Sequence, residues 1–145
     1  PPELTAGIRK VHYFVTVGAP APLQEAVAIA LALGPSYRAK LAREYRERRD
    51  LLYGALVEAG FSPSLPQGAY YMLCDITRFG FADDTAFARW LVRDVGVAGV
   101  PGSSFYSRPE LGRHLIRFTF CKTEPLLREA GERLRRTGAL AAAIR

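Results

Sequence analysis

A single arginine, Arg117, lies within the largely apolar stretch His114–Phe120. The alternation of residue types there predicts a strand, one face of which carries Leu115, Arg117 and Thr119. A guanidinium keeps its proton, so it needs a carboxylate or phosphate in fork geometry, or open water. Two interpretations follow: a pre-placed site for a small carboxylate, or a structural arginine that faces solvent or pairs with an acid of the same chain.

A loop rich in proline and glycine, Pro66–Ala69, leads directly into Tyr70 and Tyr71. A glycine such as Gly68 lets backbone approach a ligand closely, and paired tyrosines add an aromatic wall. The same pattern also fits an ordinary loop followed by core aromatic residues. The loop is therefore a candidate part of a binding site, with a purely structural alternative.

The residue types that bind metals or act as nucleophiles are few. Two cysteines, Cys74 and Cys121, and two histidines, His12 and His114, show none of the spacings of a metal site. Each cysteine lies in an apolar, strand-like run, which indicates reduced thiols in a cytoplasmic protein rather than a disulfide scaffold. We therefore predict no catalytic and no metal-binding residue in this chain.

The 145 residues include 20 Lys plus Arg and 14 Asp plus Glu, a net charge of +6. Between Ser36 and Asp50 six bases face three acids, and the local excess of +3 would suit a polyanion such as nucleic acid. However, opposite charges recur there three or four residues apart, as on a solvated helix face. The predicted pairs are Lys40–Glu44, Arg43–Glu47 and Arg46–Asp50.

The elements that must position Arg117 follow from periodicity and from turn residues. The pattern predicts an α/β (α+β) fold, in which a small three-stranded sheet packs with helices. The strand at 70–76 is apolar on both faces, which favours cover on both sides. Predicted helices are Pro2–Val15, Leu23–Leu33, Ser36–Ala59, one from Asp83 or Asp84 to Gly96, and Thr123–Gly138; predicted strands are Tyr70–Ile76, Val97–Val100 and His114–Phe120.

The helix at 23–33 is apolar on nearly every side, which predicts that it is buried. If no large domain covers it, Ala26–Leu33 would leave an apolar face exposed, and we then expect self-association. No apolar run approaches the roughly 18 residues of a membrane span, and no secretory signal is present, so we expect no membrane partner.

Several stretches, taken in order, resemble the fold-type I, pyridoxal-phosphate-dependent aminotransferases of class I/II. Pro66-Gln67-Gly68-Ala69-Tyr70-Tyr71, followed by Asp75, is similar to their P-[QE]-G-x-Y-[FY]…D stretch. Gly96–Tyr106 resembles G-V-x-x-x-P-G-x-x-F, and His114–Phe120 resembles x-x-[IV]-R-[FL]-x-[FY]. The likeness is to the subgroup of kynurenine, glutamine and methionine-type transaminases, and it covers essentially the whole chain.

The resemblance implies that residues 1–35 are a helical remnant of a large-domain or interdomain region. Residues 36–145 would then be the small C-terminal domain. It implies that Arg117 grips the substrate α-carboxylate, and that Tyr70 and Gly68 line the substrate pocket. The implied cofactor is pyridoxal 5'-phosphate, the substrates are an amino acid and a 2-oxo acid, and the implied assembly is a homo-oligomer.

The sequence departs from that family at the cofactor. The family anchors its cofactor on a Schiff-base lysine in an S-x-[ST]-K-type motif, and no such motif surrounds Lys10, Lys40 or Lys122. We expect the missing parts to precede Pro1, so that the isolated chain does not transaminate. Two alternatives stay open: an inactive, truncated or split remnant that only associates, and a basic module for anions or nucleic acid. The amino donor is not specified by the sequence.

Overall fold

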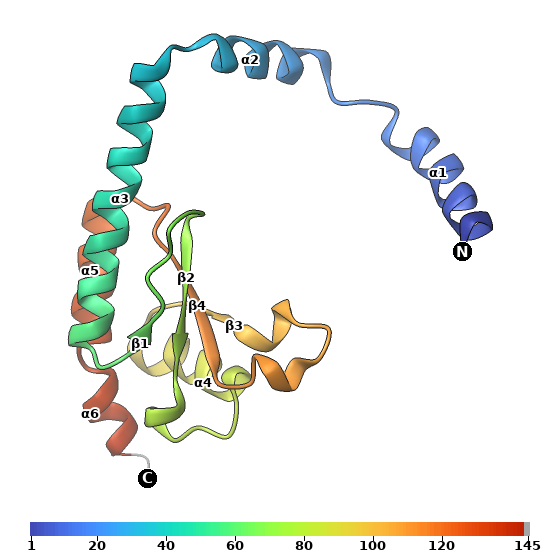
Figure 1. Ribbon diagram of the computed structural model, residues 1–145. Coiled ribbons are helices and arrows are strands. Elements are labelled where there is room, and N and C mark those ends of the chain that lie inside the picture. Colours follow the sequence, from blue (N-terminus) through green and yellow to red (C-terminus); the bar gives the residue numbers. More distant parts are fainter. Residues whose placement is uncertain (144–145) are drawn as a thin grey trace. The chain divides into compact units, whose positions relative to one another are not determined.

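The computed structural model describes residues 1–143, which form two compact units (Figure 1). The first unit comprises residues 1–41 and the second begins at Ala42. The long helix α3 (Pro35–Glu58) runs through the boundary. A domain division after residue 35 stays a prediction.

The first unit contains helices α1 (Pro2–Thr16) and α2 (Ala21–Ala32). Neither helix has a buried residue, so the predicted burial of the apolar segment at 23–33 is wrong for this chain. The physical reason is that a helix apolar all round needs neighbours on every side, and this unit provides too few. No single described helix is long and apolar enough to cross a membrane; α1 and α2 pass that test only as a pair bent by 95°.

The second unit contains a sheet of four strands in the order β1-β2-β4-β3, all of them antiparallel. Three strands were predicted, and the fourth, β1, lies in a segment for which no helix or strand was predicted. It pairs at the sheet edge, where a proline is tolerated because its missing N–H faces outward. The strands are β1 (Ser62–Pro63), β2 (Tyr71–Asp75), β3 (Val100–Pro101) and β4 (Leu115–Thr119).

The helices of the second unit begin and end largely where turn residues predict. Asp83 caps α4 (Asp84–Trp90), since its Oδ1 accepts a hydrogen bond from Ala86 N at 2.7 Å. Glycines with positive φ end α3 (Gly60, 87°) and the π-helical turn Leu91–Val95 that continues α4 (Gly96, 77°). Shorter 3₁₀ segments are Thr77–Phe79, Gly102–Phe105 and Pro109–Leu111.

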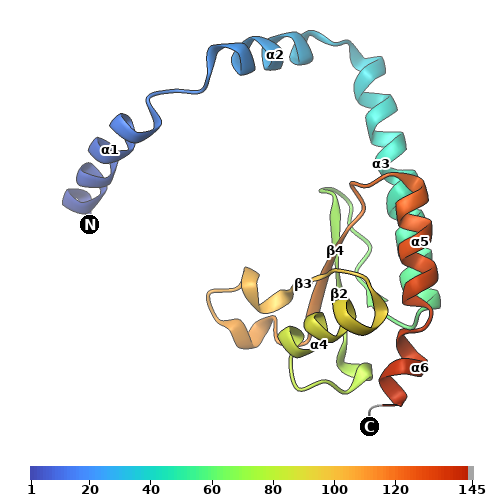
Figure 2. The same cartoon turned by 180° about the vertical axis from the view of Figure 1, so that it is seen from behind.

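The helix predicted at 123–138 is two helices, α5 (Glu124–Leu134) and α6 (Thr137–Ala142). Thr123 precedes α5 but makes no side-chain cap hydrogen bond. Arg136 N donates to Arg133 O, three residues back, so the last turn of α5 is tightened before α6 begins. Figures 1 and 2 both show α5 beside α3, where Arg135 Nη2 lies 2.9 Å from Glu58 Oε2.

One face of the sheet forms the core. Met72 and Cys74 of β2 and Ile116 and Phe118 of β4 are buried with residues of α3, α4 and α5. The alternate residues of both strands are only half-buried, apart from the exposed Asp75. Figure 1 shows α4 behind the strands and Figure 2 shows it in front of them, on the core side. Cover on both sides was therefore a wrong prediction, whereas the α+β class with a small sheet is confirmed.

Candidate functional site

Arg117 projects from β4 on the half-buried face of the sheet and lies between two aromatic rings. Its Cζ atom is 4.9 Å from the centre of the Tyr71 ring and 4.3 Å from that of Phe105. No described residue forms a hydrogen bond or ion pair with its guanidinium. The Arg117 guanidinium therefore contacts two aromatic rings rather than an acid of the described residues, and its contact with a substrate stays a prediction.

The sheet itself determines where Arg117 lies. β4 is an inner strand, so Arg117 is paired with Leu73 of β2 on one side and with Val100 of β3 on the other. Tyr71 is two residues from Leu73 on the same face, at the diagonal distance from which a large ring reaches a cross-strand neighbour. The ring and the arginine are thus held by one ladder of backbone hydrogen bonds. Cation–π contacts of this kind keep the guanidinium plane ordered while leaving its N–H edge available.

The second ring comes from a segment for which no helix or strand was predicted. The residues Gly102–Phe105 form a 3₁₀ segment, at the end of which lies Phe105. Gly102 is buried, and a Cβ atom there would lie 2.6 Å from Leu115 Cβ, so only glycine permits this approach to β4. Phe105 was not among the predicted site residues. The signal that could have found it is the Pro-Gly-Ser-Ser-Phe run, which begins in β3, the strand that pairs with β4.

The other two predicted site residues lie further from Arg117. Tyr70 is 49% exposed, and its ring meets the Tyr71 ring edge-on with 5.4 Å between the ring centres. The Tyr70 carbonyl accepts hydrogen bonds from Phe120 N at 2.9 Å and from Thr119 Oγ1 at 3.0 Å. Gly68 is exposed, and a Cβ atom there would meet nothing within 4 Å. Substrate contacts by Tyr70 and Gly68 stay predictions.

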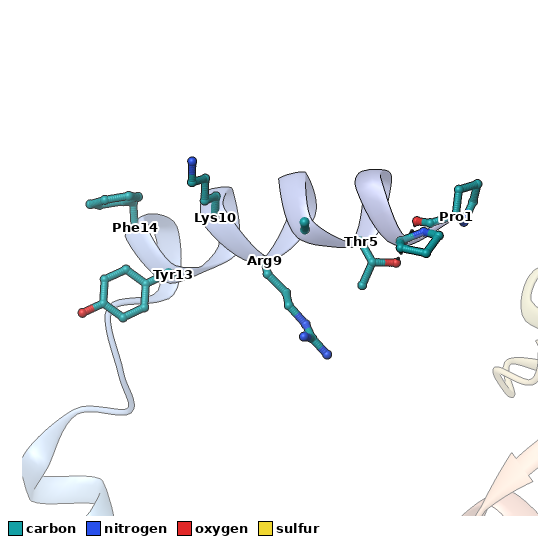
Figure 3. A pocket seen from close by; sticks show the side chains of 8 residues that line it. Pro1, Thr5, Arg9, Lys10, Tyr13 and Phe14 are labelled. Atoms are coloured by element: carbon teal, nitrogen blue, oxygen red, sulfur yellow. Dashed lines mark hydrogen bonds between the residues drawn. The ribbon is translucent and has the colours of Figure 1, made fainter.

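Neither of two further hollows includes Arg117. A hollow of ≈ 720 Å³ lies along α1, between side chains that include Arg9, Lys10 and Tyr13 (Figure 3). All of its lining comes from α1 and Pro1, so one helix alone forms it and nothing closes it from the other side. It therefore lacks the enclosing walls of a small-molecule site.

A second hollow, of ≈ 490 Å³, lies between β4 and α5. It is lined by apolar residues such as Phe118 and Leu127, with Lys122 and Arg133 also in its lining. Lys122 is the only lysine of the second unit, since Lys10 and Lys40 belong to the first. Within the second unit, this lysine therefore lines a hollow that does not include Arg117.

The Cys74 thiol does not add a reactive group. Burial raises the pKa of the Cys74 thiol from its ordinary 9.0 to about 12, so this thiol stays protonated and unreactive near neutrality. A hydrogen bond from Arg108 lowers the pKa of the exposed Glu110 carboxyl. Among residues 1–143, no cluster of His, Cys, Asp or Glu could hold a metal ion.

The basic stretch of α3 pairs its charges within the helix. Arg43 Nε lies 3.9 Å from Glu47 Oε1, which confirms one predicted pair. Asp50 pairs with Arg49 at 2.7 Å, where Arg46 was expected. Such exposed pairs are typical of a solvated helix face rather than of a surface kept free for phosphates.

Comparison with known proteins relates the whole arrangement to one family. The model of "Aminotransferase class I and II" matches residues 1–134. A probable N-succinyldiaminopimelate aminotransferase of Mycobacterium tuberculosis is 37% identical over 142 residues, which cover 92% of this chain and 36% of that protein. Methionine aminotransferase of Escherichia coli is 38% identical over 135 residues, 93% of this chain and 35% of that protein.

Solved structures give the same relation. The structure of the N-succinyldiaminopimelate aminotransferase from Mycobacterium tuberculosis superimposes with a TM-score of 0.80 and 39% identity. The match covers 94% of this chain and 36% of that one. The chain thus spans little more than a third of the length of the curated relatives it matches.

Proposed function

Because the chain belongs to the class I and II aminotransferase family, we propose that its second unit binds the α-carboxylate of an amino acid or 2-oxo acid through Arg117. One observation supports this proposal above all. The Arg117 guanidinium lies half-buried between two rings and has no acidic partner among the described residues. A substrate carboxylate that accepts two parallel N–H bonds would complete its hydrogen bonding.

In the complete enzyme this unit would contribute orientation. When Arg117 holds the carboxylate of the substrate, the amino group and the Cα–H bond of the same molecule lie at defined positions. This orientation lowers the entropic cost of the reaction. The rings of Tyr71 and Phe105, whose centres lie 4.9 Å and 4.3 Å from the guanidinium carbon, lower its contact with water, so that a charge-assisted hydrogen bond there is stronger than in bulk water. The proposed activity is transfer of an amino group between an amino acid and a 2-oxo acid.

We propose pyridoxal 5'-phosphate as the cofactor of that complete enzyme. When bound, it would supply the electron sink for bond breaking at Cα. The residues of the second unit do not fit its anchoring, because its one lysine, Lys122, lines a hollow that does not include Arg117. We therefore place the anchor outside the second unit and propose that the isolated chain is inactive. Homo-oligomerisation is a further proposal, supported by the exposed apolar residues of α1 and α2.

The proposal is tested by titrating the chain with pyruvate and L-alanine while the backbone amide signals of Leu115–Thr119, which wild type and variants share, are followed by NMR. We expect a saturable shift, binding about tenfold weaker in Arg117→Lys, and no binding in Arg117→Gln, since lysine lacks the planar fork. Arg113→Gln is the matched control, because it removes the same charge from an exposed arginine that donates to Ala82 O. Equal binding by wild type and Arg117→Gln would reject the proposal in favour of a remnant that only associates.

A further inference from the structure

The Phe105 ring lies against Arg117 without belonging to a strand. Tyr71, the other ring, is held by the β2–β4 ladder. Phe105 instead ends the 3₁₀ segment Gly102–Phe105 and is 46% exposed. Its place beside the guanidinium therefore depends on whatever fixes that segment.

A buried carboxylate makes the connection. Asp84, the first residue of α4, is only 2% exposed, and its Oδ2 accepts a hydrogen bond from Ser103 N at 2.6 Å. Its Oδ1 accepts from Thr85 N at 3.0 Å, within the same turn. Ser103 is 19 residues further along the chain and two residues before Phe105. The bond thus ties the start of a core helix to the segment that carries the ring.

Two features show that this is more than helix capping. Asp83, the preceding residue, already caps α4 through Ala86 N. In addition, no lysine or arginine among the described residues pairs with Asp84. A buried carboxylate without a cation is costly, and bonds to backbone N–H groups must offset that cost. The bond to Ser103 is therefore a strong restraint on the 3₁₀ segment.

We propose that Asp84 is a positioning residue for the carboxylate site, which it serves by holding Phe105 against Arg117 through the Ser103 amide. Loss of this bond would release the 3₁₀ segment and let the ring leave the guanidinium. Arg117 would then sample several orientations and lose more side-chain freedom on binding. The expected effect on ligand affinity rests on the proposed function. The expected effect on the contact between the Phe105 ring and the guanidinium is independent of that function.

The test compares Asp84→Ala, Asp84→Asn and Asp83→Ala by two measurements. The first is the ring-current shift of the Arg117 Nε–H signal without ligand, with Phe105→Leu as the reference for a missing ring. The second is pyruvate affinity. We expect Asp84→Ala to move the signal toward that reference and to weaken binding about fivefold to tenfold. Asp84→Asn, whose side-chain oxygen can still accept from Ser103 N, should restore most of both.

Asp83→Ala is the matched control, since it removes the α4 cap but leaves Ser103 bonded. It should lower stability and leave both measurements unchanged. An unchanged Arg117 signal in Asp84→Ala, or an equal shift in Asp83→Ala, would overturn the inference. If Asp84→Ala does not fold, Ser103→Pro takes its place, because it deletes the N–H that donates to Asp84. It must then move the Arg117 signal toward the Phe105→Leu reference. Absence of pyruvate binding in the wild type would reject the proposed function alone, because the signal without ligand still tests Asp84.

Discussion

The backbones of Gly102 and Gly112 are in close contact with each other beside β4. A Cβ atom on Gly112 would lie 2.5 Å from the Gly102 carbonyl oxygen, and one on Gly102 would lie 2.7 Å from the Gly112 carbonyl oxygen. This approach joins the 3₁₀ segments Gly102–Phe105 and Pro109–Leu111 into one packed layer. Because the first of them carries Phe105, the glycine pair bears on both stability and the arginine site.

Gly112→Ala should destabilise the chain by about 1–3 kcal/mol, because the colliding atoms are backbone and cannot rotate aside. Gly54→Ala is the control: it lies within α3, a Cβ atom there meets nothing within 4 Å, and it should stabilise by about 0.5–1 kcal/mol. Urea unfolding measures both values. Equal stability of Gly112→Ala and wild type would contradict the close approach.

Stability should fall at alkaline pH through Cys74. Its pKa is raised from 9.0 to about 12 in the folded chain, so the folded state holds the thiol proton more tightly than the unfolded state does. The contribution is fully present below pH 9 and is lost as the pH rises toward about 12. Relative to Cys74→Ala, the wild type should lose about 1.4 kcal/mol of unfolding free energy per pH unit in that window. Parallel pH curves of the two proteins would contradict the burial effect.

Pyridoxal 5'-phosphate added to the chain should give no stoichiometric imine absorbance band. The reason is that no lysine of the second unit lies by Arg117, and Lys122 lies in a separate hollow. Borohydride reduction and peptide mapping should find only sparse adducts, spread over several amines. Lys122→Arg serves as the control for adventitious reaction in that hollow. One stoichiometric adduct on a single lysine would contradict the proposed inactivity of the isolated chain.

The chain should self-associate through its first unit. Large apolar side chains of α2, such as Val27 and Ile29, are 56% and 60% exposed. Such surface is rarely left open in a stable monomer. Sedimentation velocity should show concentration-dependent association that Ile29→Glu reduces, whereas Ser36→Glu, which adds the same charge at an exposed polar position, should not. A monodisperse monomer at all concentrations would count against this prediction.

Local features of the fold were predictable because their causes lie within a few residues. Gly60 and Gly96 adopt positive φ where the helical pattern stops, and Asp83 caps the helix that follows it. The period of two placed Arg117 on the face of Leu115 and Thr119, and the strand has that face half-buried. A cation in such a strand left two interpretations open, a site for a small carboxylate and a structural arginine, and only the family resemblance favoured the first.

Tertiary structure alone decided how these local elements meet. The strand β1 forms only because Ser62 pairs with Asp75 and Pro63 pairs with Cys74 of β2. The helices pack against one face of the sheet only. The sequence of β2, which is apolar on both faces, did not reveal this placement. The apolar helix α2 was predicted to be buried and is exposed, since burial depends on neighbours and not on the helix itself.

The arginine site divides in the same way. Residue types and alternation along one strand predicted which face Arg117 uses, and that its guanidinium needs either an anion or open water. The two rings that enclose it come from positions 46 and 12 residues earlier in the chain, 71 and 105, and the restraint on the second ring comes from Asp84. Contacts over such separations depend on sheet order and on the packing of glycines, which exist only after the chain has folded, so no local periodicity encodes them.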